Sequence, residues 1–291
     1  MLKKFFSKKS SSQISVYLGT NRVAICGMAD GRVDLLAQAR VATDQEWGEA
    51  LSSLVQQHKL QHHQVRVVLS RDFYQTFDIE KPKVEDSELL ASIPFAIKDL
   101  VSESIFDLVV DYYDIPLQQH KGEQITVVCT AMKLVIHIRD LLLKCEMELK
   151  EISTEELSLT ALLNVENETN ALLSEERNAL VFTVVKNGQL YFSHRIRGFN
   201  DLLALPLGEQ ENVLIDGLSL ELQRALDYIN SQLRIASINH LYVALSCPDI
   251  NALTSQLGAN LARKVEPFGE AQQYDFSNIV AYGLLMDELG K

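Results

Sequence analysis

Hydrophobic and polar positions in the first seventy residues predict three strands, a helix and a fourth strand. Turns at Gly19 and Gly31 separate the first strands and indicate an antiparallel meander. A helix is expected over residues 44–58, where Trp47 and Leu51 begin an apolar stripe at helical spacing. Apolar runs of strand length stand at residues 14–18, 22–28, 33–40 and 65–69. The helix therefore leads from the meander to a strand that can lie parallel to the first one.

The middle of the chain predicts an inserted α/β unit and then a return to the first unit. Leu89, Ile93 and Ile97 mark a helix that begins after Pro82. Further strands are expected over residues 106–114, 124–132 and 148–152, and further helices over residues 134–145 and 156–164. The polar stretch 165–170 is interpreted as the crossover to the second half of the chain.

The second half repeats the scheme of the first. Asn187 and Gly188 form a strong turn signal inside the hairpin predicted over residues 179–193. Helices are expected over residues 210–233, 249–264 and 277–289, with a strand over residues 240–245. The chain is thus predicted to divide into a basic tail (1–12), a first lobe (13–72 plus 148–170), an insertion (73–147) and a second lobe (171–291).

Composition and charge narrow the class of partner. The 291 residues are 47% hydrophobic, which is enough for a sizeable core, and the formal net charge is −12. This charge repels nucleic acid phosphates and anionic lipid, so neither is expected as a bulk partner. Locally, residues 1–12 carry four lysines around Leu2, Phe5 and Phe6. We interpret them as a flexible basic tail, with contact to a membrane surface as the alternative.

Targeting signals, cysteines and histidines indicate where the protein is located and whether it holds disulfides or a metal. Neither an export signal nor a membrane-spanning apolar run is recognisable, so a cytoplasmic location is expected. The four cysteines are too widely spaced for a disulfide framework or a metal knuckle, which favours free thiols in a reducing compartment. The histidines His58, His62 and His63 have no cysteine or carboxylate at ligand spacing, so no metal is expected there.

A search of the sequence for common enzyme motifs identifies no set of catalytic residues. The sequence contains no Gly-x-x-x-x-Gly-Lys phosphate loop, no Gly-x-Gly-x-x-Gly, no His-Glu-x-x-His and no Gly-x-Ser-x-Gly. The acidic residues Asp107, Asp111 and Asp114 fall on strand-like segments, where alternation places them on a solvent face. No catalytic residue is therefore assigned.

The two glycine-turned hairpins, at residues 15–24 and 179–193, resemble the opening strands of the two lobes of actin-like ATPases. In that superfamily each turn grips a phosphate, and an aspartate precedes the glycine because phosphate-bound Mg²⁺ needs anionic oxygen ligands. Here Tyr17 stands in the first aspartate's place, and Lys186 lies where the second motif is expected. The resemblance implies an α/β, actin-like (ribonuclease-H-like) two-lobe fold, with Gly19 and Thr20 as the remaining phosphate-side candidates.

Across nearly the whole chain, the order of short motifs resembles PilM-type proteins of type IV pilus assembly, and more closely the MshI proteins of the mannose-sensitive haemagglutinin (MSHA) pilus. The matching pieces are Tyr17-Leu-Gly-Thr-Asn-Arg-Val-Ala24, Phe77-Asp-Ile-Glu-Lys-Pro82, Val109-Val-Asp-Tyr-Tyr113, Gly188-Gln-Leu-Tyr-Phe-Ser-His-Arg195, Leu220-Glu-Leu-Gln-Arg-Ala-Leu-Asp-Tyr228 and Ala281-Tyr-Gly-Leu-Leu285.

The resemblance also allows a comparison with the nucleotide-binding residues of ATP-binding relatives. ATP-binding relatives carry a glycine pair after a late strand, whereas Ser246-Cys-Pro-Asp249 follows that strand here. Glu221 and Arg224 match a Glu-x-x-Arg near the adenosine of relatives, with an exposed helix pair as the alternative. We expect a vestigial cleft with no cofactor. Binding of ATP and Mg²⁺ by an actin-like ATPase of the same machinery is the alternative.

The resemblance finally implies a partner. PilM-type proteins bind the cytoplasmic tail of a PilN-like bitopic inner-membrane protein, in a cleft between the insertion and the first lobe, and connect it to cytoplasmic motors. A non-catalytic scaffold, peripheral to the inner membrane through this partner, is therefore expected. Contact with the cytoplasmic assembly ATPase and a homodimer both stay open. Phe95, Ile97 and Leu100 are the candidate peptide contacts, with a place in the core of the insertion as the alternative.

Overall fold

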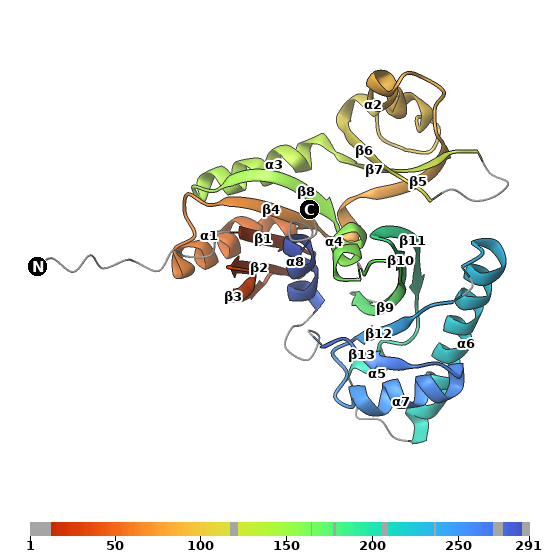
Figure 1. Cartoon of the computed structure of the whole chain (residues 1–291). Coiled ribbons are helices and arrows are strands. Elements are labelled where there is room, and N and C mark those ends of the chain that lie inside the picture. Colours follow the sequence, from red (N-terminus) through yellow and green to blue (C-terminus); the bar gives the residue numbers. More distant parts are fainter. Residues whose placement is uncertain are drawn as a thin grey trace, which may run out of the picture.

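The structure is a computed structural model that describes residues 13–116, 122–163, 165–176, 179–204, 209–235, 237–269 and 276–286. The basic tail predicted over residues 1–12 lies outside the described residues. Two five-stranded sheets form the two lobes, and a three-stranded sheet stands above the first lobe (Figure 1). We call this third sheet, together with the helix packed on it, the insertion. Among the described helices, none is long and apolar enough to cross a membrane.

The first lobe follows the predicted order closely. Its sheet runs β3-β2-β1-β4-β8, with β1 antiparallel to β2 and parallel to β4, which is in turn parallel to β8. The strands are β1 (Gln13–Leu18), β2 (Arg22–Ala29), β3 (Arg32–Arg40), β4 (Gln64–Leu69) and β8 (Glu148–Thr154). Short 3-10 turns, η1 (Asp44–Glu46) and η2 (Arg71–Phe73), precede α1 (Trp47–His58) and follow β4. Trp47 is fully buried at the start of α1, as expected for the apolar stripe.

Alternation along the first sheet creates two separate cores. Val16 and its neighbours of like parity pack against α1 and α3 (Met132–Lys144). Tyr17, Ala24 and Cys26 face the other way, toward α4 (Glu155–Leu162) and α8 (Phe276–Met286). Burial raises the pKa of the Cys26 thiol to about 12, with a smaller contribution from Asp34, so this cysteine is an inert core residue. All four cysteines are buried and free.

The second lobe repeats the first, strand for strand. Its sheet runs β11-β10-β9-β12-β13, so β9 corresponds to β1 and β10 to β2. The elements are β9 (Thr169–Glu176), β10 (Ala179–Lys186), β11 (Gln189–Ile196), α5 (Asp201–Ala204), α6 (Glu209–Gln232), β12 (His240–Ala244), α7 (Ile250–Leu261) and β13 (Val265–Pro267).

This topology corrects the sequence interpretation in one respect. The stretch predicted as a crossover over residues 165–170 runs into β9, which is the central strand of the second sheet. Consequently the counterpart of the β1–β2 turn is the β9–β10 connection between Glu176 and Ala179, and not the Asn187-Gly188 turn of the β10–β11 hairpin.

The C-terminal helix crosses back between the lobes. Whereas the sequence predicts that this helix closes the second lobe, α8 packs on the first sheet and on α4 (Figure 1). Ser15 Oγ donates to the Ala281 carbonyl at 2.5 Å, and Arg66 Nη1 donates to the Leu284 carbonyl at 3.0 Å. At Gly283 the two helices approach so closely that a Cβ there would overlap the Ser158 carbonyl.

The insertion has its own small core. Its sheet runs β5-β7-β6, from β5 (Gln75–Glu80), β6 (Leu108–Asp114) and β7 (Gln124–Ala131), and α2 (Asp86–Ala96) covers one face, with η3 (Ile105–Asp107) before β6. Strand β5 is not among the predicted elements. The sequence also places residues 134–145 in the insertion, but Ile138, Leu141 and Leu142 of α3 are buried in the first lobe.

Candidate functional site

Two regions of the first lobe are candidate sites: its packed boundary with the second lobe, which we call the cleft, and a groove between β8 and the insertion. The cleft begins at the β1–β2 turn, where Gly19 lies as expected. The Gly19 N–H donates to the Arg22 carbonyl at 2.9 Å, and the Gly19 carbonyl accepts from Trp47 Nε1 at 2.8 Å. Thr20 is half-buried beside it. The turn's own hydrogen bonds thus use the backbone N–H that would face a phosphate.

Tyr17 lies just before the β1–β2 turn, at the position where the sequence resemblance leads us to expect an aspartate. Its ring lies against Gly19, so closely that a Cβ on Gly19 would stand 2.7 Å from Tyr17 Cε1. Only 6% of the tyrosine is exposed. Its hydroxyl donates to Glu155 Oε1 at 2.8 Å, at the start of α4. A buried phenol therefore stands where Mg²⁺ would need an anionic ligand.

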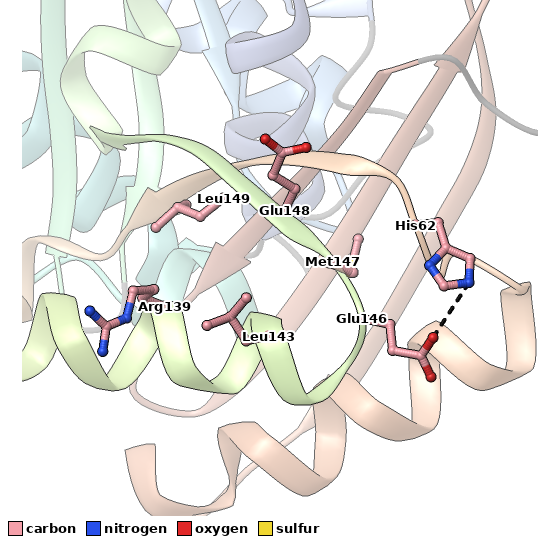
Figure 2. A pocket seen from close by; sticks show the side chains of 7 residues that line it. All are labelled: His62, Arg139, Leu143, Glu146, Met147, Glu148 and Leu149. Carbon is pink, nitrogen blue, oxygen red and sulfur yellow. Dashed lines mark ion pairs between the residues drawn. The ribbon is translucent and has the colours of Figure 1, made fainter.

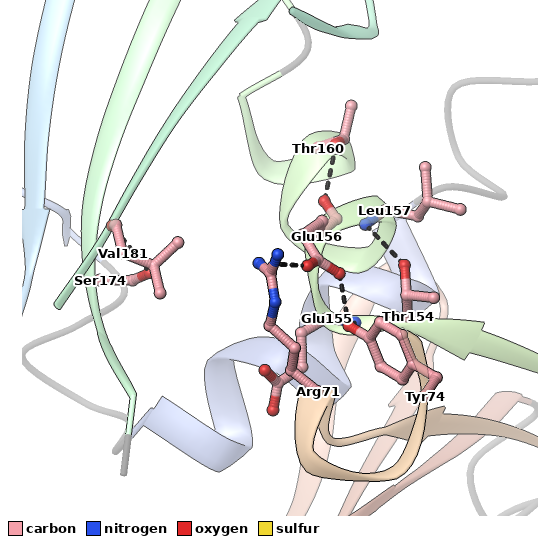
Figure 3. A network of polar contacts seen from close by, with 9 residues as sticks. All are labelled: Arg71, Tyr74, Thr154, Glu155, Glu156, Leu157, Thr160, Ser174 and Val181. Carbon is pink, nitrogen blue, oxygen red and sulfur yellow. Dashed lines mark hydrogen bonds and ion pairs between the residues drawn. The ribbon is translucent and has the colours of Figure 1, made fainter. Parts of the chain in front are cut away.

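A second tyrosine and a second glutamate extend this network (Figure 3). The Tyr74 hydroxyl donates to Glu156 Oε2, and Arg71 Nη1 lies 2.6 Å from Glu156 Oε1. Both glutamates are about 95% buried, with exposures of 4% for Glu155 and 5% for Glu156. They occupy the first turn of α4, whose dipole stabilises negative charge there.

The network holds its phenols neutral. Burial raises the pKa of Tyr17 well above its usual value, and the charge of Glu155 raises it further. Burial likewise raises the pKa of Tyr74, with Glu156 as the next largest cause. Two buried acidic side chains and two neutral phenols thus lie together at the start of α4. This arrangement suits internal hydrogen bonding and opposes a polyphosphate, because like charges would meet in a buried site.

The second lobe's side of the cleft differs from the first. Ser174 and Val181 face the network across the cleft (Figure 3), and no glycine stands in the sequence from one to the other. Glu175 Oε2 accepts from the Ser246 N–H at 3.0 Å, in the segment that follows β12. The second lobe thus supplies a carboxylate near the turn that would contact phosphate.

Glu221 and Arg224 pair with each other on the exposed face of α6. Arg224 Nη1 is 2.6 Å from Glu221 Oε1, as in the alternative interpretation of a surface helix pair. Neither they nor Gly19 and Thr20 line the cavity of about 450 Å³ between the insertion and the second lobe.

The groove between β8 and the insertion is a different kind of site. It encloses about 360 Å³, and its walls are Val109 and Asp111 of β6, Val128 and Thr130 of β7, Val135 of α3, and Leu69, Tyr74 and residues 149–154 of the first lobe. Residues two apart on β6 and on β7 share one face of the insertion sheet. By contrast, β8 contributes six consecutive residues, which means that the edge of this strand, and not one face of it, lines the groove.

The peptide contacts suggested by the sequence do not line this groove. Ile97 is fully buried in the insertion core with Leu89 and Ile93, so it is unavailable to a partner and the sequence interpretation is wrong for this residue. Phe95 and Leu100 are exposed by 59% and 51%, outside the groove lining. Of the lining residues, Val109 and Asp111 fall within the motif Val109-Val-Asp-Tyr-Tyr113. The other lining residues lie in none of the matching motifs, and only the fold reveals that β8 is an edge strand.

A further hollow lies at the opposite end of β8 (Figure 2). It encloses about 590 Å³ and is lined by His62, Arg139, Leu143, Glu146, Met147, Glu148 and Leu149. His62 Nε2 lies 3.4 Å from Glu146 Oε2. Across the described part of the chain, no three histidine, cysteine or acidic side chains gather as a metal site would require.

Comparison with solved structures identifies the fold. The chain is similar to a PilM-PilN type IV pilus biogenesis complex, with a TM-score of 0.70 at 13% identity over 95% of this chain and 98% of that one. It is also similar to the cytoplasmic domain of EpsL, an inner-membrane component of the type II secretion system of Vibrio cholerae (TM-score 0.54, 14% identity, 94% of both chains). A Bacteroides thetaiotaomicron protein with an actin-like ATPase fold and unknown function gives 0.55, at 14% identity over 98% of both chains.

No family model matches the chain, and no curated protein matches it. At these identities the likeness concerns the fold alone. The predicted fold class is confirmed: the chain has the actin-like ATPase fold, with mixed α/β sheets.

Proposed function

We propose that this protein is a non-catalytic scaffold of type IV pilus assembly that binds the cytoplasmic tail of a PilN-like bitopic inner-membrane protein. The observation that carries the proposal is the groove between β8 and the insertion, where a strand edge faces Val109, Val128 and Val135 beside the polar Asp111 and Thr130. Such a groove suits an extended peptide, since main-chain hydrogen bonds give affinity and side-chain pockets give specificity. The shared fold with PilM, in a complex with PilN, supports the same partner class. The motif resemblance to MshI proteins favours the MSHA pilus.

The absence of catalysis is part of the proposal. Tyr17 in the aspartate position, the buried pair Glu155 and Glu156, and the glycine-free segment of the second lobe all disfavour bound ATP and Mg²⁺. The role in the machinery would then be positional: the protein holds a membrane partner and presents its other faces to cytoplasmic components. It would be recovered with inner membranes when this partner is present, and fractionation with and without the partner checks that.

Titration calorimetry with a synthetic peptide tests the proposal. The peptide copies the complete cytoplasmic tail of the bitopic protein encoded beside this chain. We expect one-to-one binding and a higher melting temperature. Peptide at one hundred times its Kd would stabilise the fold by about 2.7 kcal/mol. ATP with Mg²⁺, titrated in the same way, should give no comparable shift.

Two matched variants locate the binding. Val109 is 37% exposed on the groove wall and Leu90 is 50% exposed on α2, outside the groove lining. Val109→Glu would place a charge on the apolar wall and should weaken tail binding about tenfold or more. Leu90→Glu should leave the affinity unchanged. Tail binding that is absent from the wild type at high micromolar concentration, or equal in the two variants, would refute the proposed groove.

A further inference from the structure

Helix α2 of the insertion is apolar on two faces. Its buried face carries residues at a spacing of four that pack on the insertion sheet: Leu89, Ile93 and Ile97. On its other side, Leu90 and Pro94 form one row along the helix, and Ala91 and Phe95 form the next. Leu90 is 50% exposed and Phe95 is 59% exposed. A surface helix normally turns polar residues to solvent, so the fold does not explain this second apolar face.

Leu100 extends this apolar surface past the end of the helix. Its N–H donates to the Ile97 carbonyl at 2.8 Å, which keeps it next to the last turn of α2, and it is 51% exposed. The α2 face is the name we give to five residues: Leu90, Ala91, Pro94, Phe95 and Leu100. None of them lines the groove beside β8, and Figure 1 shows α2 on the side of the insertion away from both lobes. A gathered, exposed apolar surface is typical of a protein interaction site.

Pro94 leaves a hydrogen-bond acceptor within the α2 face. Proline has no N–H, so the Leu90 carbonyl receives no bond from the residue four positions later in the helix. A backbone carbonyl that lacks its helical donor is satisfied by water or by a donor from another molecule. Lysine and arginine side chains supply such donors, whereas carboxylates do not. The helix therefore offers apolar contact and an acceptor side by side.

The rim of the α2 face is negatively charged. Three exposed carboxylates stand at its start and three follow its end: Glu85, Asp86, Glu88, Asp99, Glu103 and Asp107. Within the described part of the chain, none of the six forms an ion pair. The nearby lysines Lys81 and Lys83 pair with Asp114 and Glu80 instead, at 3.2 and 3.5 Å. With Lys98 counted, the rim keeps an excess of negative charge.

Helix stability explains only part of this charge. The dipole of α2 favours the three carboxylates at its N-terminus, but it disfavours Asp99, which lies just beyond its C-terminus. Glu103 and Asp107 lie outside the helix altogether. A positively charged partner would account for carboxylates that folding does not require.

We propose that the α2 face binds a basic amphipathic helix of another protein, with the partner's apolar residues on Leu90 and Phe95 and its lysine or arginine residues beside the acidic rim. Charge decides between the possible occupants. A second copy of this chain would bring equal acidic rims together across a two-fold axis, and an anionic membrane surface would be repelled. A basic partner turns the same charge into attraction and supplies donors for the Leu90 carbonyl.

The dimensions of α2 set the size of the partner. Its 11 residues span roughly 17 Å, which a partner helix of about three turns would cover. Two helices of this length bury less surface than a permanent interface does, so we expect a transient complex with a Kd in the micromolar range. The site goes beyond the proposed function, because the tail in the groove and the helix on the α2 face would bind different surfaces of the protein.

Three synthetic peptides of about 18 residues test the proposal, since shorter helices are marginal in water. The first carries leucines on one helical face and lysines on the other. The second has the same residues in an order that gives no apolar face, and the third is the first with every lysine replaced by glutamate. Fluorescence anisotropy with the full chain measures each Kd. We expect micromolar binding of the first peptide, binding of the second that is about tenfold weaker or less, and none of the third.

A double variant locates the apolar contact. Leu90→Ser with Phe95→Ser should weaken binding of the first peptide about tenfold or more, because both side chains lose apolar area at the centre of the interface. Leu143→Ser is the matched control, since Leu143 is 61% exposed on α3 of the first lobe, and it should leave the affinity unchanged. The double variant should still bind the tail of the membrane protein with wild-type affinity, which separates this site from the groove.

A second double variant locates the charge. Asp99→Asn with Glu103→Gln should weaken binding of the first peptide roughly threefold to tenfold at low salt, and less at high salt, as expected for exposed ion pairs. Glu146→Gln with Glu148→Gln removes two exposed charges from the first lobe and should have little effect.

Other results would overturn the proposal. Equal binding of the first two peptides, or wild-type affinity in the Leu90 and Phe95 double variant, would show that the α2 face does not bind a helix. A wild-type dimer in sedimentation velocity that this variant dissociates would make a second copy the occupant. Binding to phosphatidylglycerol vesicles that is lost in the same variant would assign the face to a membrane. Failure of the tail to bind would refute the groove alone.

Discussion

The cleft between the lobes and the groove beside β8 lie on the same first sheet but differ in how side chains occupy them. In the cleft, Tyr17 covers Gly19 and joins a buried network with Glu155. In the groove, β8 leaves its edge open opposite Val109 and Val128. The difference fits the proposed function: side chains pack against the β1–β2 turn in the cleft, whereas in the groove a sheet edge is left open that a protein partner could use.

The two lobes differ in the sequence of their corresponding turns. The β1–β2 turn keeps its glycine, whereas its counterpart between Glu176 and Ala179 contains Arg177 and Asn178. Each lobe has a carboxylate near its turn: Glu155 accepts from the Tyr17 hydroxyl, and Glu175 accepts from the Ser246 N–H. If the cleft is a structural element and the groove is the functional one, substitutions in the cleft should change stability, and substitutions in the groove should change binding.

The largest effect is expected at Gly283, where α8 meets α4 beneath the cleft. Gly283→Ala places a methyl group against the Ser158 carbonyl and should lower the free energy of unfolding by about 2–4 kcal/mol, because packed backbone cannot shift cheaply. Urea unfolding measures it. Gly122→Ala is the matched control, since its nearest neighbour would be Glu80 Oε1 at an ordinary 3.8 Å. Equal stability of the two variants would contradict the close helix contact.

A smaller loss is expected from the buried network. Glu156→Gln removes the charge that pairs with Arg71 and should lower the free energy of unfolding by about 1–3 kcal/mol, less than for a fully buried pair because Arg71 is partly exposed. Glu221→Gln breaks a pair of equal length on exposed α6 and should cost no more than about 0.5 kcal/mol. Similar losses in the two variants would show that the cleft network is no more than a surface pair.

At alkaline pH, the fall in the free energy of unfolding should depend on the buried tyrosines Tyr17 and Tyr74 more than on an exposed tyrosine. The pKa values of both phenols are raised in the folded protein, whereas in the unfolded chain the pKa of a tyrosine is about 10. The stability that each neutral phenol contributes is therefore fully present below about pH 10. It is lost as the pH rises from about 10 toward the pKa of the folded state. Above pH 10 each such tyrosine should steepen the fall in stability by about 1.4 kcal/mol per pH unit. Tyr17→Phe with Tyr74→Phe should start less stable and decline less steeply in urea titrations from pH 9 to 11. Exposed Tyr228→Phe should keep the wild-type slope, and a wild-type slope in the double variant would contradict the buried phenols.

The sequence predicts the elements of the first lobe almost completely, because strong turns and one amphipathic helix determine them locally. The sequence does not predict the place of a helix or strand where that place depends on contacts with segments far away in the sequence. Strand β9 begins in a polar stretch, and only its pairing with β10 and β12 shows that it is central. The helix α8 is apolar on more than one face, so periodicity does not say which lobe it joins.

The residues of the candidate sites could likewise be recognised from the sequence only in part. Tyr17 could be recognised from its place before Gly19, and the predicted loss of the first aspartate rests on it. The predicted loss of the second aspartate refers to Lys186, which stands at the β10–β11 turn and not at the counterpart of the β1–β2 turn. Glu155 and Glu156 carry no sequence signal, since acidic residues are common in a first helical turn. Edge strands and grooves are properties of the assembled sheets. Ile97 therefore looks like a peptide contact in the sequence, but it proves to be core.

Hydrogen exchange of the protein, alone, with the tail peptide and with ATP and Mg²⁺, tests the central claim most directly. The account predicts that the peptide slows amide exchange in β8 and in the facing strands β6 and β7, while the β1–β2 turn is unchanged. It also predicts that ATP with Mg²⁺ changes neither region. Protection of the β1–β2 turn by ATP, with none in β8 from the peptide, would contradict the account.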